Sequence, residues 1–334
     1  MPISIQDVAK KANVSISTVS RVLNRRNIVN EDTCKRVEKA INDLGYSPNV
    51  FARGLMLRRS HILGLVLPDL HGEFYSEIIR GANLRARELG YKLMISSAVA
   101  KDDGSELIAA VANHGIVDGL VVMISEVSSR IRETLRKATV PLVILDGDVD
   151  GVTHDSVVID QRAGTVAMVR HLLRCRTIRK IIFVGGPVTN IDTMERLSAY
   201  REVTAEFDVT VDHADIHHLD YQYDTAFELA AANVVEWARR GAAVFAANDE
   251  MAAGIIDAAL AAQFTVPADL AVVGFDDTRI ASMTRPRLTT VRVPMSDMGA
   301  AAIDLLCQRL ENAERPSTKL ILQSKLIIRE SCGS

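Results

Sequence analysis

The chain has 334 residues, which is too many for a single ordinary hydrophobic core and predicts two or three domains. Hydrophobic residues make up 48% of it, as in ordinary globular proteins, and no apolar run reaches the ~18 residues that indicate a membrane span. The net charge is −3, but residues 1–60 hold 11 basic and 5 acidic residues, while the remaining 28 basic and 37 acidic residues give a balance of −9. Either the basic segment meets a polyanion or it is merely solvated, and charge alone does not separate the two.

The N-terminus begins Met-Pro-Ile-Ser-Ile-Gln-Asp, with neither a basic start nor a long apolar stretch, and this argues against a secretory signal. The four cysteines are scattered and form no CxxC pair, so we expect a reducing compartment and no zinc site built on cysteine. We therefore expect a cytoplasmic protein with no membrane association, no metal and no cofactor.

The first predicted element is a short helix over residues 5–12. Ser4 is a suitable N-cap, and Asp7 stands at the third helical position, where a carboxylate interacts favourably with the helix dipole. The apolar residues of this segment recur at helical spacing and predict one buried face: Val8, Ala9 and Ala12.

A tight turn and a second helix follow. Asn13 tolerates the left-handed conformation that ends one helix and turns the chain into another. Ser15 can cap the next helix, over residues 16–24, whose buried side contains Val19 and Val22. A third helix is predicted over 31–44. Three short helices with a tight turn between the first two are typical of a helix-turn-helix, whose second helix lies in the major groove of DNA.

The second helix carries its polar and charged residues on the face opposite Val19 and Val22. Arg21 can donate two parallel hydrogen bonds to guanine, whereas Ile16 can make only an apolar contact with a base. We predict base contacts from Ile16, Ser17 and Arg21. Residues better placed for phosphates, which position the protein without specifying sequence, are Ser15, Thr18 and Asn24.

At this point the residues resemble the LacI/GalR family of bacterial transcription regulators. The resemblance rests on Val14-Ser15-Ile16-Ser17-Thr18-Val19-Ser20-Arg21-Val22-Leu23-Asn24, Leu44-Gly45-Tyr46-Ser47-Pro48-Asn49, Asn248-Asp249-Glu250-Met251-Ala252, Gly274-Phe275-Asp276-Asp277, Arg285-Pro286-Arg287-Leu288-Thr289-Thr290 and Leu326-Ile327-Ile328-Arg329-Glu330-Ser331. It spans essentially the whole chain. It implies a helix-turn-helix DNA-binding domain over residues 1–46 followed by a hinge over 47–60.

The resemblance also implies how the hinge works. A segment of this length is marginal as an isolated helix. In the family it folds on operator DNA, and two hinges enter the minor groove together. Ala52, Arg53 and Leu55 stand at the matching positions, with Leu55 as the wedge that unstacks a base step and kinks the duplex.

Beyond residue 60, apolar runs alternate with amphipathic stretches. The predicted strands are 62–67, 93–96, 119–123, 142–145, 180–184, 243–246 and 271–274, and the predicted helices are 74–89, 106–114, 164–174, 225–239 and 251–262. Such alternation is typical of α/β folds with doubly wound parallel sheets. The family implies two lobes resembling periplasmic binding proteins: an N-terminal lobe over 61–160 and 292–321, and a C-terminal lobe over 161–291 and 322–334.

Ligands of open parallel sheets bind beyond the carboxyl ends of the strands. The positions that match effector contacts in the family are Phe74, Asp146, Arg196, Tyr221, Asn248 and Asp276. Aspartate accepts and arginine donates hydrogen bonds, and an aromatic ring can stack on a sugar ring, so this set suits a sugar or sugar derivative. A purine-responsive or an activating regulator stays open, although Asn190 stands where purine-responsive members have an arginine.

The sequence also bears on two other classes of function, an enzyme and a metal-binding or sugar-binding protein. The sequence has no GxSxG, no P-loop and no GxGxxG after a strand, so we expect no enzyme. His213, Asp215, His217 and His218 resemble metal ligands, but the segment reads as loop or edge strand, and we expect no metal there. A sugar-binding protein without a DNA role would leave the basic N-terminal segment unexplained.

We therefore predict a regulator, most simply a repressor, whose binding to double-stranded operator DNA is controlled by a small effector between two lobes. Coupling of the two sites would run through a homodimer. The helix beginning at Phe74 is the expected dimer surface, and no heptad-repeat helix follows Arg329 to make a tetramer.

Overall fold

The computed structural model describes residues 3–24, 29–46, 59–98, 104–175 and 178–333. By the contacts among its residues the chain divides into two units, Met1–Ser60 and His61–Ser334. Most of the predicted hinge lies outside the described residues, and with it Ala52, Arg53 and Leu55. The roles given to these three side chains therefore stay predictions.

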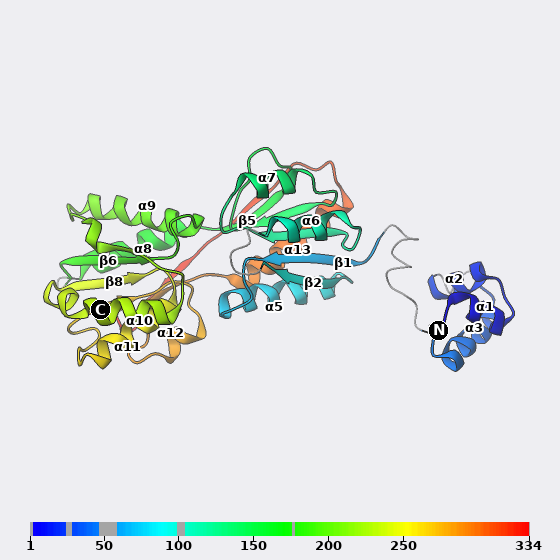
Figure 1. Ribbon diagram of the computed structural model, residues 1–334, viewed down its shortest axis with the longest axis horizontal. Coiled ribbons are helices and arrows are strands. Elements are labelled where there is room, and N and C mark those ends of the chain that lie inside the picture. Colours follow the sequence, from blue (N-terminus) through cyan, green and yellow to red (C-terminus); the bar gives the residue numbers. More distant parts are fainter. Residues whose placement is uncertain (1–2, 25–28, 47–58, 99–103, 176–177, 334) are drawn as a thin grey trace. The chain divides into compact units, whose positions relative to one another are not determined.

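The described residues of the first unit form three helices, which match the predicted ones: α1 (Ile5–Ala12), α2 (Ile16–Asn24) and α3 (Glu31–Leu44) (Figure 1). The Ser4 Oγ accepts the Asp7 N–H at 3.4 Å, and the Asp7 carboxylate accepts the Ser4 N–H at 2.9 Å, so each residue caps the other. Asn13 has a φ of 51°, the left-handed conformation that the tight turn requires.

A small apolar core holds the three helices together. Each helix contributes a valine that no solvent reaches, namely Val8, Val19 and Val37. Alanines complete the packing, because Ala9 and Ala12 let α1 approach the other two helices closely. The sulfur-bearing member of this core, Cys34, was not predicted as buried, since a cysteine gives a weak periodic signal among the charged residues of α3.

The second unit contains two parallel sheets. The first has six strands in the order β11-β5-β4-β3-β1-β2, and every pairing in it is parallel. Its strands are β1 (Ile62–Leu67), β2 (Lys92–Ser97), β3 (Gly119–Met123), β4 (Leu142–Leu145), β5 (Asp155–Ile159) and β11 (Lys319–Leu322). Alternate residues of β1 enter different cores, Leu65 with α5 and α13 and Val66 with α6 and α7, so helices cover both faces. Those helices are α5 (Glu73–Glu88), α6 (Ser105–Asn113), α7 (Ser129–Arg136) and α13 (Met295–Glu311).

Helices α5 and α13 cross in direct backbone contact. A Cβ on Gly81 of α5 would lie 1.9 Å from the carbonyl oxygen of Ser296, and one on Gly299 of α13 would lie 2.1 Å from the carbonyl oxygen of Ile78. Only glycine at both positions permits this approach. The contact fixes the inner face of α5, so the opposite face of this helix remains for solvent or a partner.

The second sheet has four strands in the order β7-β6-β8-β9, again all parallel. They are β6 (Lys180–Gly185), β7 (Ile216–His218), β8 (Ala242–Ala246) and β9 (Ala271–Val273). The helices of this lobe are α8 (Gln161–Arg174), α9 (Ile191–Glu206), the short η2 (His213–Asp215), α10 (Tyr223–Arg239), α11 (Asp249–Ala261) and α12 (Arg279–Met283).

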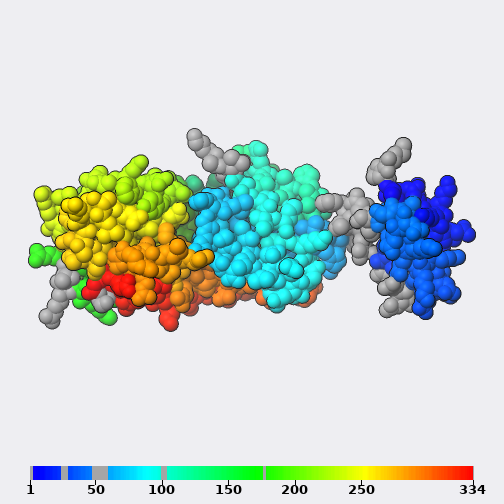
Figure 2. All heavy atoms as spheres, turned by 90° about the horizontal axis from the view of Figure 1, so that it is seen from below, coloured from blue at the N-terminus to red at the C-terminus, as the bar shows by residue number. Residues whose placement is uncertain are grey.

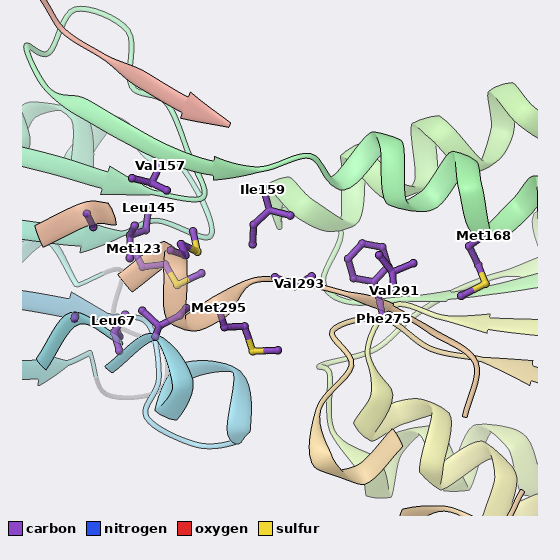
Figure 3. Close-up of a cluster of buried hydrophobic side chains, with 14 of the residues drawn as sticks. Leu67, Met123, Leu145, Val157, Ile159, Met168, Phe275, Val291, Val293 and Met295 are labelled. Atoms are coloured by element: carbon purple, nitrogen blue, oxygen red, sulfur yellow. The ribbon is translucent and has the colours of Figure 1, made fainter. Parts of the chain in front are cut away.

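The chain passes between the two lobes close to a shared apolar cluster. Strand β5 ends at Ile159 and α8 begins at Gln161, while β10 (Thr290–Arg292) pairs antiparallel with β12 (Lys325–Ile327). Figure 3 shows side chains of this cluster extending from one lobe to the other, with Val293 between them. The predicted fold class, a helix-turn-helix domain with two parallel-sheet α/β lobes, is confirmed, and the exact lobe boundaries remain a prediction. Among the described helices, none is both long and apolar enough to cross a membrane.

A buried carboxylate ties β5 to the segment after α13. Asp155 is fully buried and accepts two hydrogen bonds from Arg309, at 2.8 and 2.9 Å. The Arg315 guanidinium adds a third at 2.6 Å, and the Thr318 N–H adds a fourth at 2.7 Å. This network sets the register of β11 beside β5, because Thr318 immediately precedes β11.

Replacing this carboxylate should destabilise the second unit. We expect Asp155→Asn to lower its free energy of unfolding by about 3–5 kcal/mol, since Arg309 would be left buried without a countercharge. Urea unfolding followed by circular dichroism measures this. The matched control is Glu77→Gln, which breaks an ion pair with Arg80 on the exposed side of α5 and should leave unfolding unchanged. Equal effects of both variants would contradict the structural role of Asp155.

Candidate functional site

The first candidate site is the exposed face of α2. Ile16 is 46% exposed, and Ser17 and Arg21 are exposed as well, whereas Val19 and Val22 are buried on the opposite side. Exposed Ile16 at the start of this short helix and exposed Arg21 in its last turn have no role in the core of this unit. The face therefore has the shape and the donors for contact with base edges in a major groove.

Ser15 organises the start of this helix. Its Oγ accepts the Thr18 N–H at 3.1 Å and lies 2.9 Å from the Thr18 hydroxyl and 2.7 Å from the Ser17 hydroxyl. Three hydroxyls thus gather where the helix presents its free N–H groups, an arrangement that suits a phosphate. Asn24 is the last residue of α2, and its side chain lies outside what the structure describes.

The second candidate site is a cavity of about 330 Å³ between the two lobes of the second unit. All six residues predicted for effector contact line it: Phe74, Asp146, Arg196, Tyr221, Asn248 and Asp276. The lobes also touch directly beside it, since Glu73 accepts the Arg279 N–H at 2.8 Å and Ser125 accepts the Ile191 N–H at 3.0 Å. In the space-filling view the two lobes meet without a gap (Figure 2).

Two of the predicted carboxylates follow strands, as the strand-end rule predicts. Asp146 comes directly after β4 and has a φ of 51°, and its Oδ1 accepts the Ile159 N–H at 3.4 Å. Asp276 lies three residues after β9 with a φ of 109°. Both side chains are more than nine-tenths buried. These unusual backbone conformations turn the two carboxylates toward the same cavity from opposite lobes.

Arg196 brings a guanidinium into this cluster from α9. It is only 4% exposed and lies over the Phe275 ring, with the Cζ 4.0 Å from the ring centroid. The Nε donates to Gln161 at 3.0 Å, and the Nη1 donates to the Ala247 carbonyl. Two of its nitrogens are therefore committed to the protein, which holds the guanidinium in a fixed plane.

Hydrogen bonds to the protein also hold the Tyr221 side chain in place. Its hydroxyl donates to the Asn190 side chain at 2.9 Å and lies 2.6 Å from the Thr193 hydroxyl. Burial raises the pKa of Tyr221 to about 12, so the phenol keeps its proton at neutral pH. The Asn190 side chain also accepts the Thr193 N–H at 2.9 Å as the N-cap of α9, and it is thus held by two structural contacts.

Asn248 and its neighbour Asp249 begin α11. The Asn248 Oδ1 caps this helix by accepting the Met251 N–H at 2.9 Å, and its Nδ2 donates to the Tyr221 carbonyl at 3.0 Å. Asp249 is buried and accepts from the Thr290 hydroxyl at 2.5 Å and from the Thr278 N–H at 2.7 Å. Asp249 therefore clamps the loop that carries Asp276 against the chain that crosses between the lobes.

The carboxyl groups around the cavity are electrostatically unusual. Burial raises the pKa of Asp146 well above its ordinary value, and the nearby Asp192 carboxylate adds to this effect. Burial likewise raises the pKa of Asp192 and, strongly, that of Asp276, while the charge of Arg196 opposes both shifts. Burial also raises the pKa of Asp249 to about 7, against the lowering effect of its threonine partners.

Several residues of the cavity were not predicted from the sequence. Tyr75 packs its ring edge-to-face on Phe74 with the ring centroids 5.4 Å apart, and Asp192, Gln222 and Glu250 also line the cavity. These residues lie in or next to the first turns of α5, α9, α10 and α11, not directly after strands. One signal was present in the sequence, because Asp192 and Arg196 are four apart and face each other on a helix.

The histidine-rich segment near residue 215 does not form a metal site among the residues that the structure describes. Asp215 is buried and pairs with Lys180 at 2.8 Å and with Arg240 at 2.6 Å. His218 contacts the Gly186 carbonyl at 3.0 Å. The segment consists of the edge strand β7 and the short helix η2 before it, and its carboxylate, Asp215, forms ion pairs.

The chain matches two family models. Residues 4–49 match bacterial regulatory proteins of the lacI family, and residues 169–332 match the periplasmic binding protein-like domain. Among curated relatives, the HTH-type transcriptional regulator RegA of Clostridium saccharobutylicum is 33% identical over 333 residues, which is 99% of each chain.

Solved structures of transcription regulators also match this chain over almost its full length. The lac repressor dimer bound to operator and the anti-inducer ONPF matches with a TM-score of 0.86 at 26% identity, covering 100% of each chain. The complex of the transcriptional regulator CelR with cellobiose matches with a TM-score of 0.74 at 29% identity, covering 98% of this chain and 99% of the other. The chain therefore belongs to the LacI family and is a DNA-binding transcription regulator, not an enzyme.

Proposed function

We propose that this regulator is a cytoplasmic homodimeric repressor whose affinity for operator DNA changes when a sugar or sugar derivative binds between its lobes. The observation that carries the proposal is the convergence of the six predicted effector-contact residues on one cavity lined by both lobes. A ligand that contacts both lobes can favour one relative arrangement of them, and this is how binding at one site alters another.

The exposed face of α2 supports specific reading of DNA. In this proposal Ile16, Ser17 and Arg21 contact base edges, and the hydroxyls of Ser15 and Thr18 contact phosphates together with Asn24. The minor-groove contacts of Ala52, Arg53 and Leu55 belong to the same proposal. Only base contacts discriminate between sequences, so the two groups differ in what their removal does.

Arg21→Ala should cost about 1–3 kcal/mol in operator binding, and the loss should be confined to one base pair per half-site, because a bidentate contact to guanine is removed. Binding titrations on an operator selected from random duplexes, and on its single-base variants, measure this. Arg36→Ala on the exposed side of α3 removes the same charge away from the reading face and serves as the control. A uniform loss across all sequences would make Arg21 a phosphate contact.

The chemistry of the cavity supports a sugar. Half-buried Phe74 offers a ring face, while the aspartates accept hydrogen bonds from hydroxyls and Arg196 holds a guanidinium at the floor. The solved complex of the related CelR holds cellobiose. A purine is supported less well, since the Asn190 amide is already used as a helix cap and as the acceptor for Tyr221.

We expect at least one member of a panel of mono- and disaccharides to bind the full-length protein in calorimetry, and no free purine base to bind. Phe74→Ala should weaken that binding by about tenfold, because stacking on an aromatic ring is worth ~0.5–1.5 kcal/mol beyond its area. Phe207→Ala, at an exposed ring after α9, is the control and should bind normally. Tight binding of a purine base without any response to sugars would refute a sugar effector.

The first lobe presents an apolar surface suited to a second copy of the chain. Leu84 on α5 is 49% exposed, Leu70 before α5 is 47% exposed, and Ile95 on the edge strand β2 is 38% exposed. Large exposed apolar side chains on an edge strand and on the helix that packs beside it are typical of protein interfaces. Two copies would also supply the paired DNA-binding units that a two-fold operator requires.

Sedimentation of the full-length protein should give a dimer at micromolar concentration. Leu84→Glu should shift it toward the monomer, since a carboxylate would be buried at the interface, whereas Val188→Glu, after β6 in the other lobe, should leave the dimer intact. A stable tetramer, or a monomer with the wild-type sequence, would contradict this assembly.

A further inference from the structure

A second cavity, which we call the side cavity, lies in the first lobe and adjoins the cavity between the lobes. Its volume is about 210 Å³. Four residues line both cavities, namely Pro68, Met123, Ile124 and Ser125. None of the six predicted effector-contact residues lines the side cavity, so those contacts do not account for it.

The side cavity lies where the topology of the first sheet opens. Strands β1 and β3 are neighbours, but α5 follows β1 on one face of the sheet, whereas α7 follows β3 on the other face (Figure 1). Neighbouring strands of this kind leave a crevice beyond their carboxyl ends, and ligands of doubly wound sheets bind there. The side cavity continues this crevice toward α6 and α7, since Ile108 of α6 and Ile131 of α7 line it.

The floor of the side cavity is apolar. Four of its lining residues belong to the buried core between the sheet and helices α6 and α7, and each is at most 5% exposed: Val66, Ile108, Ile124 and Ile131. Protein interiors hold few voids larger than a water molecule, and an apolar cavity of ~150 Å³ admits benzene. The side cavity therefore has the size and the lining for one apolar six-membered ring.

Polar groups beside this floor are largely used by the protein itself. The Ser128 Oγ accepts the Ile131 N–H at 3.0 Å as the N-cap of α7. The Ser125 carbonyl accepts the Ile191 N–H at 3.0 Å from the other lobe, and Glu126 is exposed to solvent. A ligand rich in hydroxyls would find few partners over the floor, and burying hydroxyls without partners is costly.

Ala98 and Gly104 lie at another wall of the side cavity. The Ala98 N–H donates to the Leu67 carbonyl at 3.4 Å, which holds Ala98 beside the end of β1. A Cβ on Gly104 would lie 3.5 Å from the Ala98 Cβ, so the two residues are in close contact. Because Ala98 has a small side chain, a larger residue at this position would take up part of the side cavity.

We propose that the effector sugar carries an apolar substituent, such as the aryl group of a glycoside, and that the side cavity holds this substituent. This inference rests on the proposed sugar effector and names a further part of the same molecule. The sugar hydroxyls bind the polar groups of the cavity between the lobes, and the substituent extends past Pro68 and Ser125, which line both cavities. Burial of the substituent adds affinity that a free sugar lacks.

Two other occupants fit the side cavity less well. The second ring of a disaccharide would place hydroxyls against Val66, Ile124 and Ile131, none of which has a side-chain partner for them. An unattached apolar molecule would not make use of the four residues that the two cavities share, whereas a substituted sugar contacts them along its whole length.

Calorimetry on the full-length protein separates these occupants. The ligands are methyl glycosides and phenyl glycosides of glucose, galactose, mannose and xylose in both anomeric forms, the disaccharides cellobiose and lactose, and phenol alone. Ala98→Leu reduces the side cavity. The matched control is Ala110→Leu, which makes the same substitution at an exposed position of α6.

In at least one series we expect the phenyl glycoside to bind about tenfold more tightly than the methyl glycoside, because an aromatic ring is removed from water. Ala98→Leu should abolish this preference and leave binding of the methyl glycoside unchanged, and Ala110→Leu should retain the preference. The inference is overturned if no phenyl glycoside is preferred, if Ala98→Leu keeps the preference, if a disaccharide gains as much, or if phenol binds without a sugar. Binding of methyl glycosides without a phenyl preference leaves the sugar effector standing, whereas no binding by any sugar removes both proposals.

Two further measurements locate the phenyl ring. The heat-capacity change of binding should be more negative for the phenyl than for the methyl glycoside, and Ala98→Leu should remove the difference, since burial of apolar surface lowers the heat capacity. Phe74→Ala should weaken both glycosides alike, because Phe74 lines only the cavity between the lobes. If Phe74→Ala instead removed the phenyl preference, the ring would stack on Phe74 and the inference would be wrong.

Discussion

Asp249 makes the hydrogen bonds on which the geometry of the cavity depends. Its buried carboxylate accepts from Thr278, in the loop that carries Asp276, and from Thr290, in a segment that crosses between the lobes. The same helix start places Asn248 against the backbone of Tyr221. Because one carboxylate joins the helix, the loop and the crossing segment, a ligand contact at Asp276 is mechanically tied to the connection between the lobes.

The connection between the lobes is formed largely by apolar side chains. Val291 and Val293 are buried in a cluster that contains side chains of both lobes, and Phe275 adds a ring that also packs under Arg196 (Figure 3). Close-packed apolar groups shift between discrete arrangements and do not deform continuously. A ligand that binds one arrangement of the lobes more tightly than another would shift the balance between them.

Local features such as helix caps were predicted best from the sequence. Helices and strands whose buried faces contain polar residues were predicted worst. The three N-terminal helices were found because Ser4, Asn13 and Ser15 cap or end them with residues of known preference. Helix α9 was missed because its buried face includes Thr193, Arg196 and Thr204, which hide the apolar period. Strand β5 was missed for the same reason, since it begins with a buried aspartate and serine. Strand ends located Asp146 and Asp276, whereas Asp192 lies on a helix and needed the fold to bring it near them.

The distribution of charge assigns the two kinds of ligand to different parts of one chain. The N-terminal 60 residues carry a positive balance and the rest a negative one, so the phosphate backbone of DNA is attracted to the first unit and repelled by the second. The cavity of the second unit adds a further constraint, since Asp146 and Asp276 reach it from opposite lobes. A ligand that contacts both carboxyl groups would favour the arrangement in which the lobes bring them together, and part of its binding energy would then become a preference for that arrangement.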